Sequence, residues 1–169
     1  MKAWLKTGLI GGLILGIVTL IGTFSYKLPE TVLIGLFLSC FNLCTFILLY
    51  PLIGVVTVAW DPSKPEPIDG AKLGALAGLI AGIIDGVFTV ISAVINIFVG
   101  GSEYLISNIP PEAITPFQER MYEALSSPVY ILSGAIIGSL FSILFAVGLG
   151  ALGGFLYSTF KNKKEAVVE

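Results

Sequence analysis

Charged side chains are scarce in this chain of 169 residues. They make up 12% of it, as 9 basic and 11 acidic residues, whereas an ordinary soluble domain carries about 25%. So few charges cannot cover a water-soluble protein of this size with a polar shell. The composition therefore excludes most soluble folds.

Histidine is absent and cysteine is nearly so. Without histidine the chain lacks the commonest metal ligand and the usual acid or base at neutral pH. Cys40 and Cys44 lie in an apolar run and have no third soft ligand, so we expect no metal and no cofactor. The net charge of −2 predicts no nucleic-acid partner. No nucleophile–base pair or phosphate-binding loop is found in the sequence, so we expect no enzyme.

Apolar residues dominate instead, at 56% of the chain with 20 Gly and 11 Phe. They form four runs, each long enough to cross a hydrocarbon core of about 30 Å. We therefore expect an all-α, polytopic membrane protein with a single domain over residues 1–169, built as a bundle of four transmembrane helices. The predicted helices cover about 6–25, 32–60, 72–99 and 129–160.

The longest connector, residues 100–128, contains four glutamates and one arginine. Thr115-Pro116-Phe117-Gln118 resembles a capping box with proline at the first helical position. Phe117, Met121 and Leu125 then share one helical face. These features predict a short surface helix at about 116–125, within an outer loop.

The distribution of basic residues predicts the orientation in a cell membrane. On one side of the four runs only Lys27 and Arg120 are basic. Because basic residues favour the cytoplasmic side, we expect both termini in the cytoplasm. The basic residues on that side are Lys2, Lys6, Lys64, Lys72, Lys161, Lys163 and Lys164.

Glycines recur at four-residue steps along three of the four runs. Since lipid gives helices no hydrophobic reason to associate, close approach through small residues becomes the main attraction. We expect these glycine ladders to pack the helices tightly, within the bundle and against a second copy or another membrane protein. The ladder glycines are Gly8, Gly12 and Gly16; Gly74, Gly78, Gly82 and Gly86; and Gly134, Gly138, Gly150 and Gly154, the last set continued through Ser142 and Ala146.

Asp85 is the one charged residue deep inside an apolar run. Insertion of a central aspartate costs about 2.5–3.5 kcal/mol, which its apolar neighbours offset. Thr19, Asn42, Asp85 and either Ser139 or Ser142 lie about 15–20 Å from the helix ends at 1.5 Å per residue, so they form one polar layer. Thr89, Ser92 and Asn96 extend the Asp85 face along the third run.

Two interpretations of this layer remain open. In one, Asp85 is a proton or cation site of a small transporter or channel, with Thr89, Ser92 and Asn96 lining an outward path. In the other, Asp85 hydrogen-bonds to Asn42 or Thr19 and fixes the register of the helices or of a homo-oligomer. The first function hypothesis is accordingly a structural or accessory membrane protein, and its alternative is a transporter of protons, cations or a small solute.

A resemblance supports the layout of four spans. The stretch Asp69-Gly70-Ala71-Lys72-Leu73-Gly74-Ala75-Leu76-Ala77-Gly78-Leu79-Ile80-Ala81-Gly82 follows a glycine-rich first run with a basic start. This arrangement resembles small, glycine-rich four-helix membrane proteins of uncharacterised function that are found mainly in archaea. The resemblance implies four spans and no known enzymatic activity, and it assigns no site residues.

Overall fold

Four helices make up the part of the chain that the computed structural model describes, in the order α1 (Ala3–Ser25), α2 (Val32–Ala59), α3 (Pro67–Phe98) and α6 (Pro128–Glu165). The described residues are 2–25, 32–63, 65–98 and 127–165, with side chains except at 24, 25, 32–43, 162, 164 and 165. The predicted surface helix at 116–125 lies outside these residues. Three of the four helices, α1, α3 and α6, are long and apolar enough to cross a membrane. The fold is therefore all-helical and fits a membrane-embedded protein.

Local signals place the starts of α3 and α6 outside the apolar runs. α3 begins at Pro67 and carries Asp69 in its first turn. An acidic side chain at this position stabilises the helix through its interaction with the helix dipole. α6 begins at Pro128, and the Ser127 hydroxyl accepts the Tyr130 N–H at 3.2 Å as an N-cap. Capping residues, and not the limits of the hydrophobic segments, thus set where these two helices begin.

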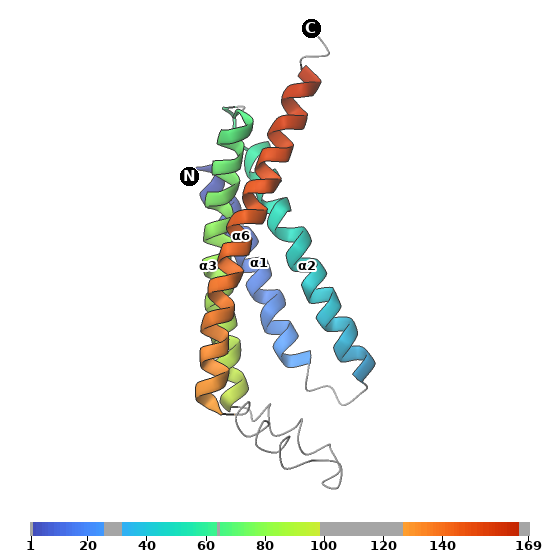
Figure 1. Cartoon of the computed structure of the whole chain (residues 1–169), viewed down its shortest axis with the longest axis vertical. Coiled ribbons are helices and arrows are strands. Elements are labelled where there is room, and N and C mark those ends of the chain that lie inside the picture. Colours follow the sequence, from blue (N-terminus) through green and yellow to red (C-terminus); the bar gives the residue numbers. More distant parts are fainter. Residues whose placement is uncertain (1, 26–31, 64, 99–126, 166–169) are drawn as a thin grey trace.

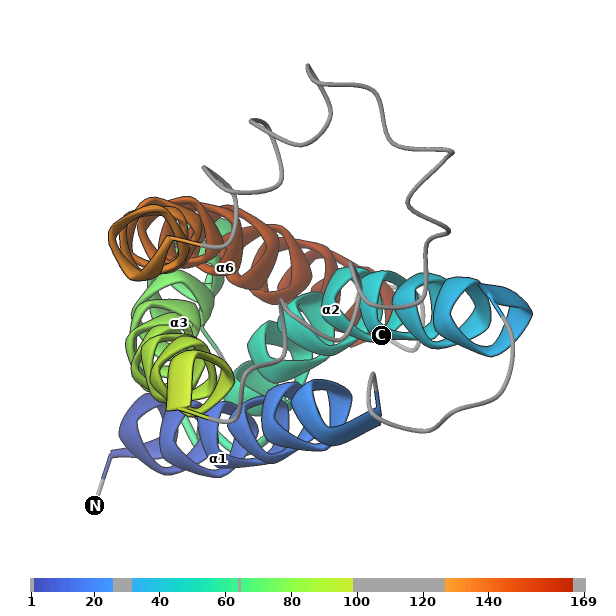
Figure 2. The same cartoon turned by 90° about the horizontal axis from the view of Figure 1, so that it is seen from below.

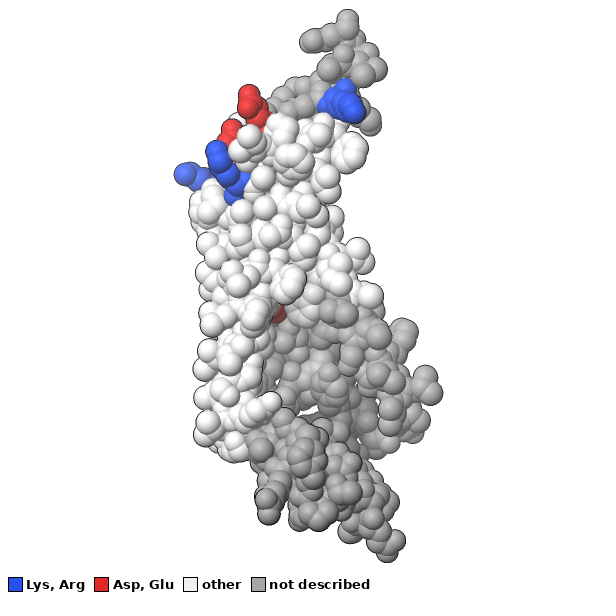
Figure 3. Space-filling view, in the orientation of Figure 1, with Lys and Arg blue, Asp and Glu red and all other residues white. Residues whose placement is uncertain are grey.

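The helices surround a common axis (Figures 1 and 2). The N-terminus, the turn between α2 and α3 and the C-terminal part of α6 all lie at one end, which we call the charged end (Figure 1). Figure 3 shows the described lysines and, apart from the buried Asp85, the described acidic residues grouped there. From the charged end, α3 and α6 run side by side, while α2 diverges from the bundle toward its own N-terminus (Figures 1 and 2).

Glycines bring α3 and α6 into backbone contact. A Cβ added at Gly78 would overlap the backbone of Ala146, and one added at Gly150 would lie 2.5 Å from the Gly74 carbonyl oxygen. Gly154 faces Gly70 in the same way. In a lipid environment such close approach supplies van der Waals contact that larger residues would prevent.

α1 packs on α3 through the first ladder. A Cβ at Gly8 would lie 2.8 Å from the Ala77 carbonyl oxygen, and one at Gly12 would lie 2.9 Å from the Ala81 Cα. Gly16 faces the ring of Phe88. On the other side of α3, Gly82 and Gly86 face Ala146 and Ser139 of α6. Small residues thus allow α3 to be covered by α1 and α6 together.

Gly134 and Gly138 depart from this pattern. A Cβ at either position would meet nothing within 4 Å among the described residues. The reason is geometric, because a four-residue step advances about 400° around a helix of 3.6 residues per turn and so drifts by about 40°. Three steps from Gly150 to Gly138 carry the ladder about 120° away from α3, and Ser139 takes the contact with Gly86 instead.

We predict opposite results for leucine at two ladder positions. Gly78→Leu forces α3 and α6 apart at Ala146, so the free energy of unfolding should fall by about 3 kcal/mol. Gly138→Leu meets open space, and the better helix propensity of leucine should leave stability unchanged or raise it by up to about 1 kcal/mol. Denaturation in detergent, followed by circular dichroism, measures both. An equal loss in the two variants would contradict this packing.

Candidate functional site

The candidate site is built around Asp85 in the middle of α3. Its side chain is 1% exposed. A carboxyl group buried in this way is costly unless hydrogen bonds or a counter-charge compensate it. The described residues supply hydrogen bonds from three other helices.

Three hydroxyl groups donate to the Asp85 carboxylate. Thr19 Oγ1 of α1 donates to Oδ1 at 2.9 Å, Tyr50 OH of α2 donates to Oδ2 at 3.1 Å, and Ser142 Oγ of α6 donates to Oδ2 at 3.0 Å. The Tyr50 and Ser142 hydroxyl oxygens also lie 3.1 Å from each other. All four helices therefore meet at one carboxyl group, and we call Asp85, Thr19, Tyr50 and Ser142 the Asp85 cluster.

Apolar side chains pack around Tyr50, on one side of the Asp85 cluster. Tyr50 is 2% exposed, and its ring stacks on Phe46 with centroids 6.0 Å apart. Around it lies a buried apolar core to which every one of the four helices contributes. That core consists of Leu15, Tyr50, Ile53, Ala77, Ala81 and Ala146. The hydrogen bonds of Asp85 thus form in a medium of low dielectric constant, where they are stronger than in water.

The rest of the predicted polar face lies along α3 beyond the Asp85 cluster. Thr89 Oγ1 donates to the backbone carbonyl of Asp85 at 3.0 Å and not to its carboxylate. Ser92 is 6% exposed, and its hydroxyl has no hydrogen-bond partner among the described residues. Asn96 is half-buried one turn further. The side chain of Asn42 lies outside the described residues.

Of the two serines that the sequence placed in this layer, Ser142 contacts the Asp85 carboxylate. Ser139 donates to backbone carbonyls, that of Gly86 at 3.2 Å and that of Ala135 at 2.6 Å. It therefore ties α6 to α3 without joining the Asp85 cluster.

Tyr50 is the member of the Asp85 cluster that sequence reasoning did not find. It stands before Pro51 inside α2, within the apolar run of residues 32–60. A signal was present, since a tyrosine deep in a hydrophobic segment needs a partner for its hydroxyl group. Its proximity to Asp85 depends on how α2 lies against α6, where Gly54 faces Gly150 and Gly153 faces the Pro51 carbonyl group.

A second polar contact joins α1 to α2 nearer the charged end. The Thr7 and Thr57 hydroxyl oxygens lie 2.6 Å apart, and these residues are 4% and 0% exposed. Each hydroxyl also reaches a carbonyl oxygen of its own helix, Thr7 that of Ala3 at 3.0 Å and Thr57 that of Ile53 at 2.7 Å. This pair was absent from the predicted site residues.

Comparison of this chain with protein-family models, with curated proteins and with solved structures gives no match. The resemblance of residues 69–82 to archaeal membrane proteins stays a prediction. Among the described residues no group of three or more His, Cys, Asp or Glu side chains lies together to hold a metal ion. The chemistry available to the Asp85 cluster is hydrogen bonding and the exchange of a proton.

We predict that Tyr50→Phe destabilises the protein. Phenylalanine keeps the ring that stacks on Phe46 but removes one donor from a buried carboxylate, so the free energy of unfolding should fall by about 1 kcal/mol. Tyr130→Phe is the matched control, because that side chain is 54% exposed on α6. Thermal denaturation in detergent compares the two variants, and equal stability of both with the wild type would contradict a structural role of the Tyr50 hydroxyl.

Proposed function

We propose that the chain is a four-span membrane protein with a structural or accessory role and both termini in the cytoplasm. The orientation is supported by the described lysines at the charged end, Lys2, Lys6, Lys72, Lys161 and Lys163 (Figure 3). α2 supplies the fourth span, through its apolar segment Cys44–Ala59 and the turns that precede it. The proposed role does not involve catalysis.

One observation carries this proposal, namely a face of α6 that contacts no other described helix. Gly134, Gly138 and Gly148 lie on α6 with open space where a Cβ would stand. Large apolar side chains lie between these glycines, with Phe141 59% and Leu144 68% exposed. Small residues flanked by large apolar ones favour helix–helix contact in membranes. We propose that this face associates with a second copy or with another membrane protein.

Self-association should fail when the face is blocked. Gly138→Leu adds a side chain where a neighbouring helix would approach, so the oligomer fraction should drop at unchanged monomer stability. Leu76→Phe, on the exposed side of α3, is the control, since it enlarges a side chain away from that face. Analytical ultracentrifugation in detergent measures the oligomer. Unchanged association of Gly138→Leu would contradict self-association through α6.

A second candidate function is transport of a proton or cation. It is favoured by the number of hydroxyl protons available for the hydrogen bonds of the Asp85 cluster. Asp85 Oδ2, Tyr50 OH and Ser142 Oγ form a triangle of three close contacts, at 3.1, 3.0 and 3.1 Å. Two hydroxyl groups supply only two protons for these three contacts. A proton on Asp85 would complete the ring, so the site has room for one more proton.

Transport through Asp85 is tested by Asp85→Asn in liposomes. A wild-type proton or cation flux that vanishes in this variant, at unchanged oligomeric state, would favour transport. Thr159→Ala is the control, because its hydroxyl donates only to the Phe155 carbonyl of α6. No flux in the wild type would contradict this alternative and leave the structural role.

A further inference from the structure

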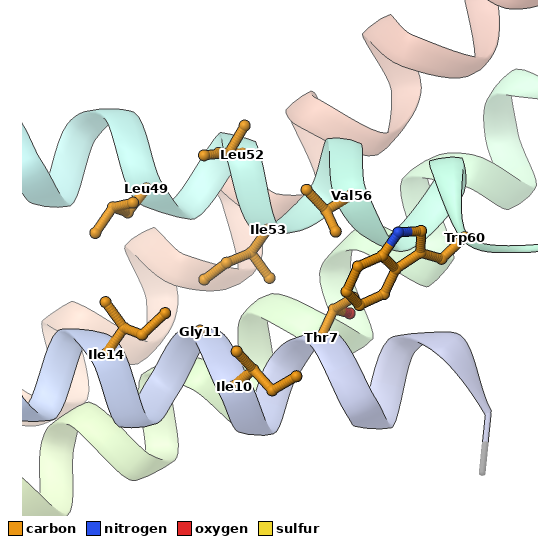
Figure 4. A pocket seen from close by; sticks show the side chains of 9 residues that line it. All are labelled: Thr7, Ile10, Gly11, Ile14, Leu49, Leu52, Ile53, Val56 and Trp60. Atoms are coloured by element: carbon orange, nitrogen blue, oxygen red, sulfur yellow. The ribbon is translucent and has the colours of Figure 1, made fainter.

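A groove runs between α1 and α2 on the outside of the bundle (Figure 4). Its volume is about 140 Å³, several times the roughly 30 Å³ that a water molecule occupies in the liquid. From Thr7 to Ile14 it extends about 10 Å along α1 at 1.5 Å per residue. The walls are aliphatic, with Ile10, Gly11 and Ile14 from α1 facing Leu52, Ile53 and Val56 from α2.

The side-chain hydroxyl group in the wall of the groove already has hydrogen-bond partners. Thr7 carries the one side-chain hydroxyl in the wall, and that hydroxyl already pairs with Thr57 and with the Ala3 carbonyl. Apolar cavities without free polar groups stay dry and bind apolar molecules. The groove is therefore suited to a hydrocarbon chain and not to water or a polar solute.

The groove ends at Trp60, and Trp60 also lines a wider cleft of about 790 Å³ at the charged end. Lys2 and Lys6 line this cleft, and the Lys6 ammonium lies 5.5 Å from the centroid of the Trp60 ring. A tryptophan and lysines in this position are typical of the interface between hydrocarbon and headgroups. Apolar groove and basic cleft thus follow one another along the membrane normal.

One acidic residue also lines the cleft, and it is engaged elsewhere. Asp61 Oδ1 accepts the Ser63 N–H at 2.8 Å and the Ser63 hydroxyl group. These hydrogen bonds lower the pKa of Asp61 below its usual value, so it remains anionic and tied to its own turn. With two lysines against this one carboxylate, the cleft keeps a net positive charge.

We propose that the groove and cleft together bind one anionic phospholipid, with an acyl chain along α1 and α2 and the phosphate beside Lys2 and Lys6. The order of the parts matches such a lipid, since the groove starts at the interface and extends about 10 Å into a leaflet that is about 15 Å deep. Basic residues near a membrane surface attract anionic headgroups. The charge of the cleft selects this class over zwitterionic lipids.

Native mass spectrometry of the full chain in detergent tests the proposal. Phosphatidylglycerol is titrated against phosphatidylcholine of the same acyl chains, and the wild type should bind the anionic lipid more tightly. Lys2→Gln with Lys6→Gln should weaken that binding about 30-fold, at about 1 kcal/mol for each lysine. Lys161→Gln with Lys163→Gln removes the same charge from α6 and should change it little. Equal binding of the two lipids by the wild type would overturn the proposal.

Further variants separate the headgroup from the acyl chain. Val56→Phe fills the groove and should weaken the binding of phosphatidylglycerol, whereas Leu76→Phe on the exposed side of α3 should not. Inorganic phosphate alone should not compete. Full binding by Val56→Phe, or competition by phosphate, would overturn the role of the groove. Lys2→Gln alone serves as a second charge variant, because Lys6 also packs on the Trp60 ring and its replacement could disturb that contact. If Lys2→Gln binds phosphatidylglycerol as tightly as the wild type does, the proposed role of Lys2 is overturned.

Discussion

Hydrogen bonding to the Asp85 carboxyl group is the constraint on which the arrangement of the helices depends. A carboxylate cannot be left without partners in a hydrocarbon-like interior, where each unsatisfied polar group costs several kcal/mol. Thr19, Tyr50 and Ser142 satisfy it from α1, α2 and α6. Any rotation or sliding of one helix would remove a donor. A single carboxyl group thus joins all four helices at one level.

Glycines make this convergence sterically feasible. The hydroxyls of threonine and serine are short, so the helices must approach closely for them to reach α3. Gly12 against Ala81 and Gly78 against Ala146 allow that approach on the two sides of α3. Where the four-residue ladder of α6 drifts away from α3, Gly138 faces outward. The same periodicity therefore makes the inner contact and leaves the outer face open.

The sequence predicted the class of the fold and part of the Asp85 cluster. An all-helical fold follows from the apolar runs. Counting residues from their ends placed Thr19, Asn42 and either Ser139 or Ser142 at the depth of Asp85, and Thr19 and Ser142 do donate to its carboxylate. Depth is a property of each helix by itself, so it can be read along the chain. The rotation of a helix about its own axis cannot be read along the chain, because it depends on which helices become neighbours.

For this reason Tyr50 and the outward position of Gly138 were not predicted. Tyr50 reaches Asp85 because α2 packs on α6 through Gly54 and Gly153, which lie almost a hundred residues apart in the sequence. Gly138 belongs to a strict ladder, but the contact with Gly86 passes to Ser139, one residue further along the chain. Both facts depend on pairs of helices that no local pattern identifies.

A double-mutant cycle between Asp85→Asn and Tyr50→Phe measures how strongly the Asp85 carboxyl group is coupled to the Tyr50 hydroxyl group. The free energies of unfolding of the wild type, both single variants and the double variant are measured in the same detergent. If the carboxylate holds α2 through the Tyr50 hydroxyl, the effects are not additive, and a coupling free energy of about 1 kcal/mol results. Additive losses would show that the two groups act independently and would contradict the account.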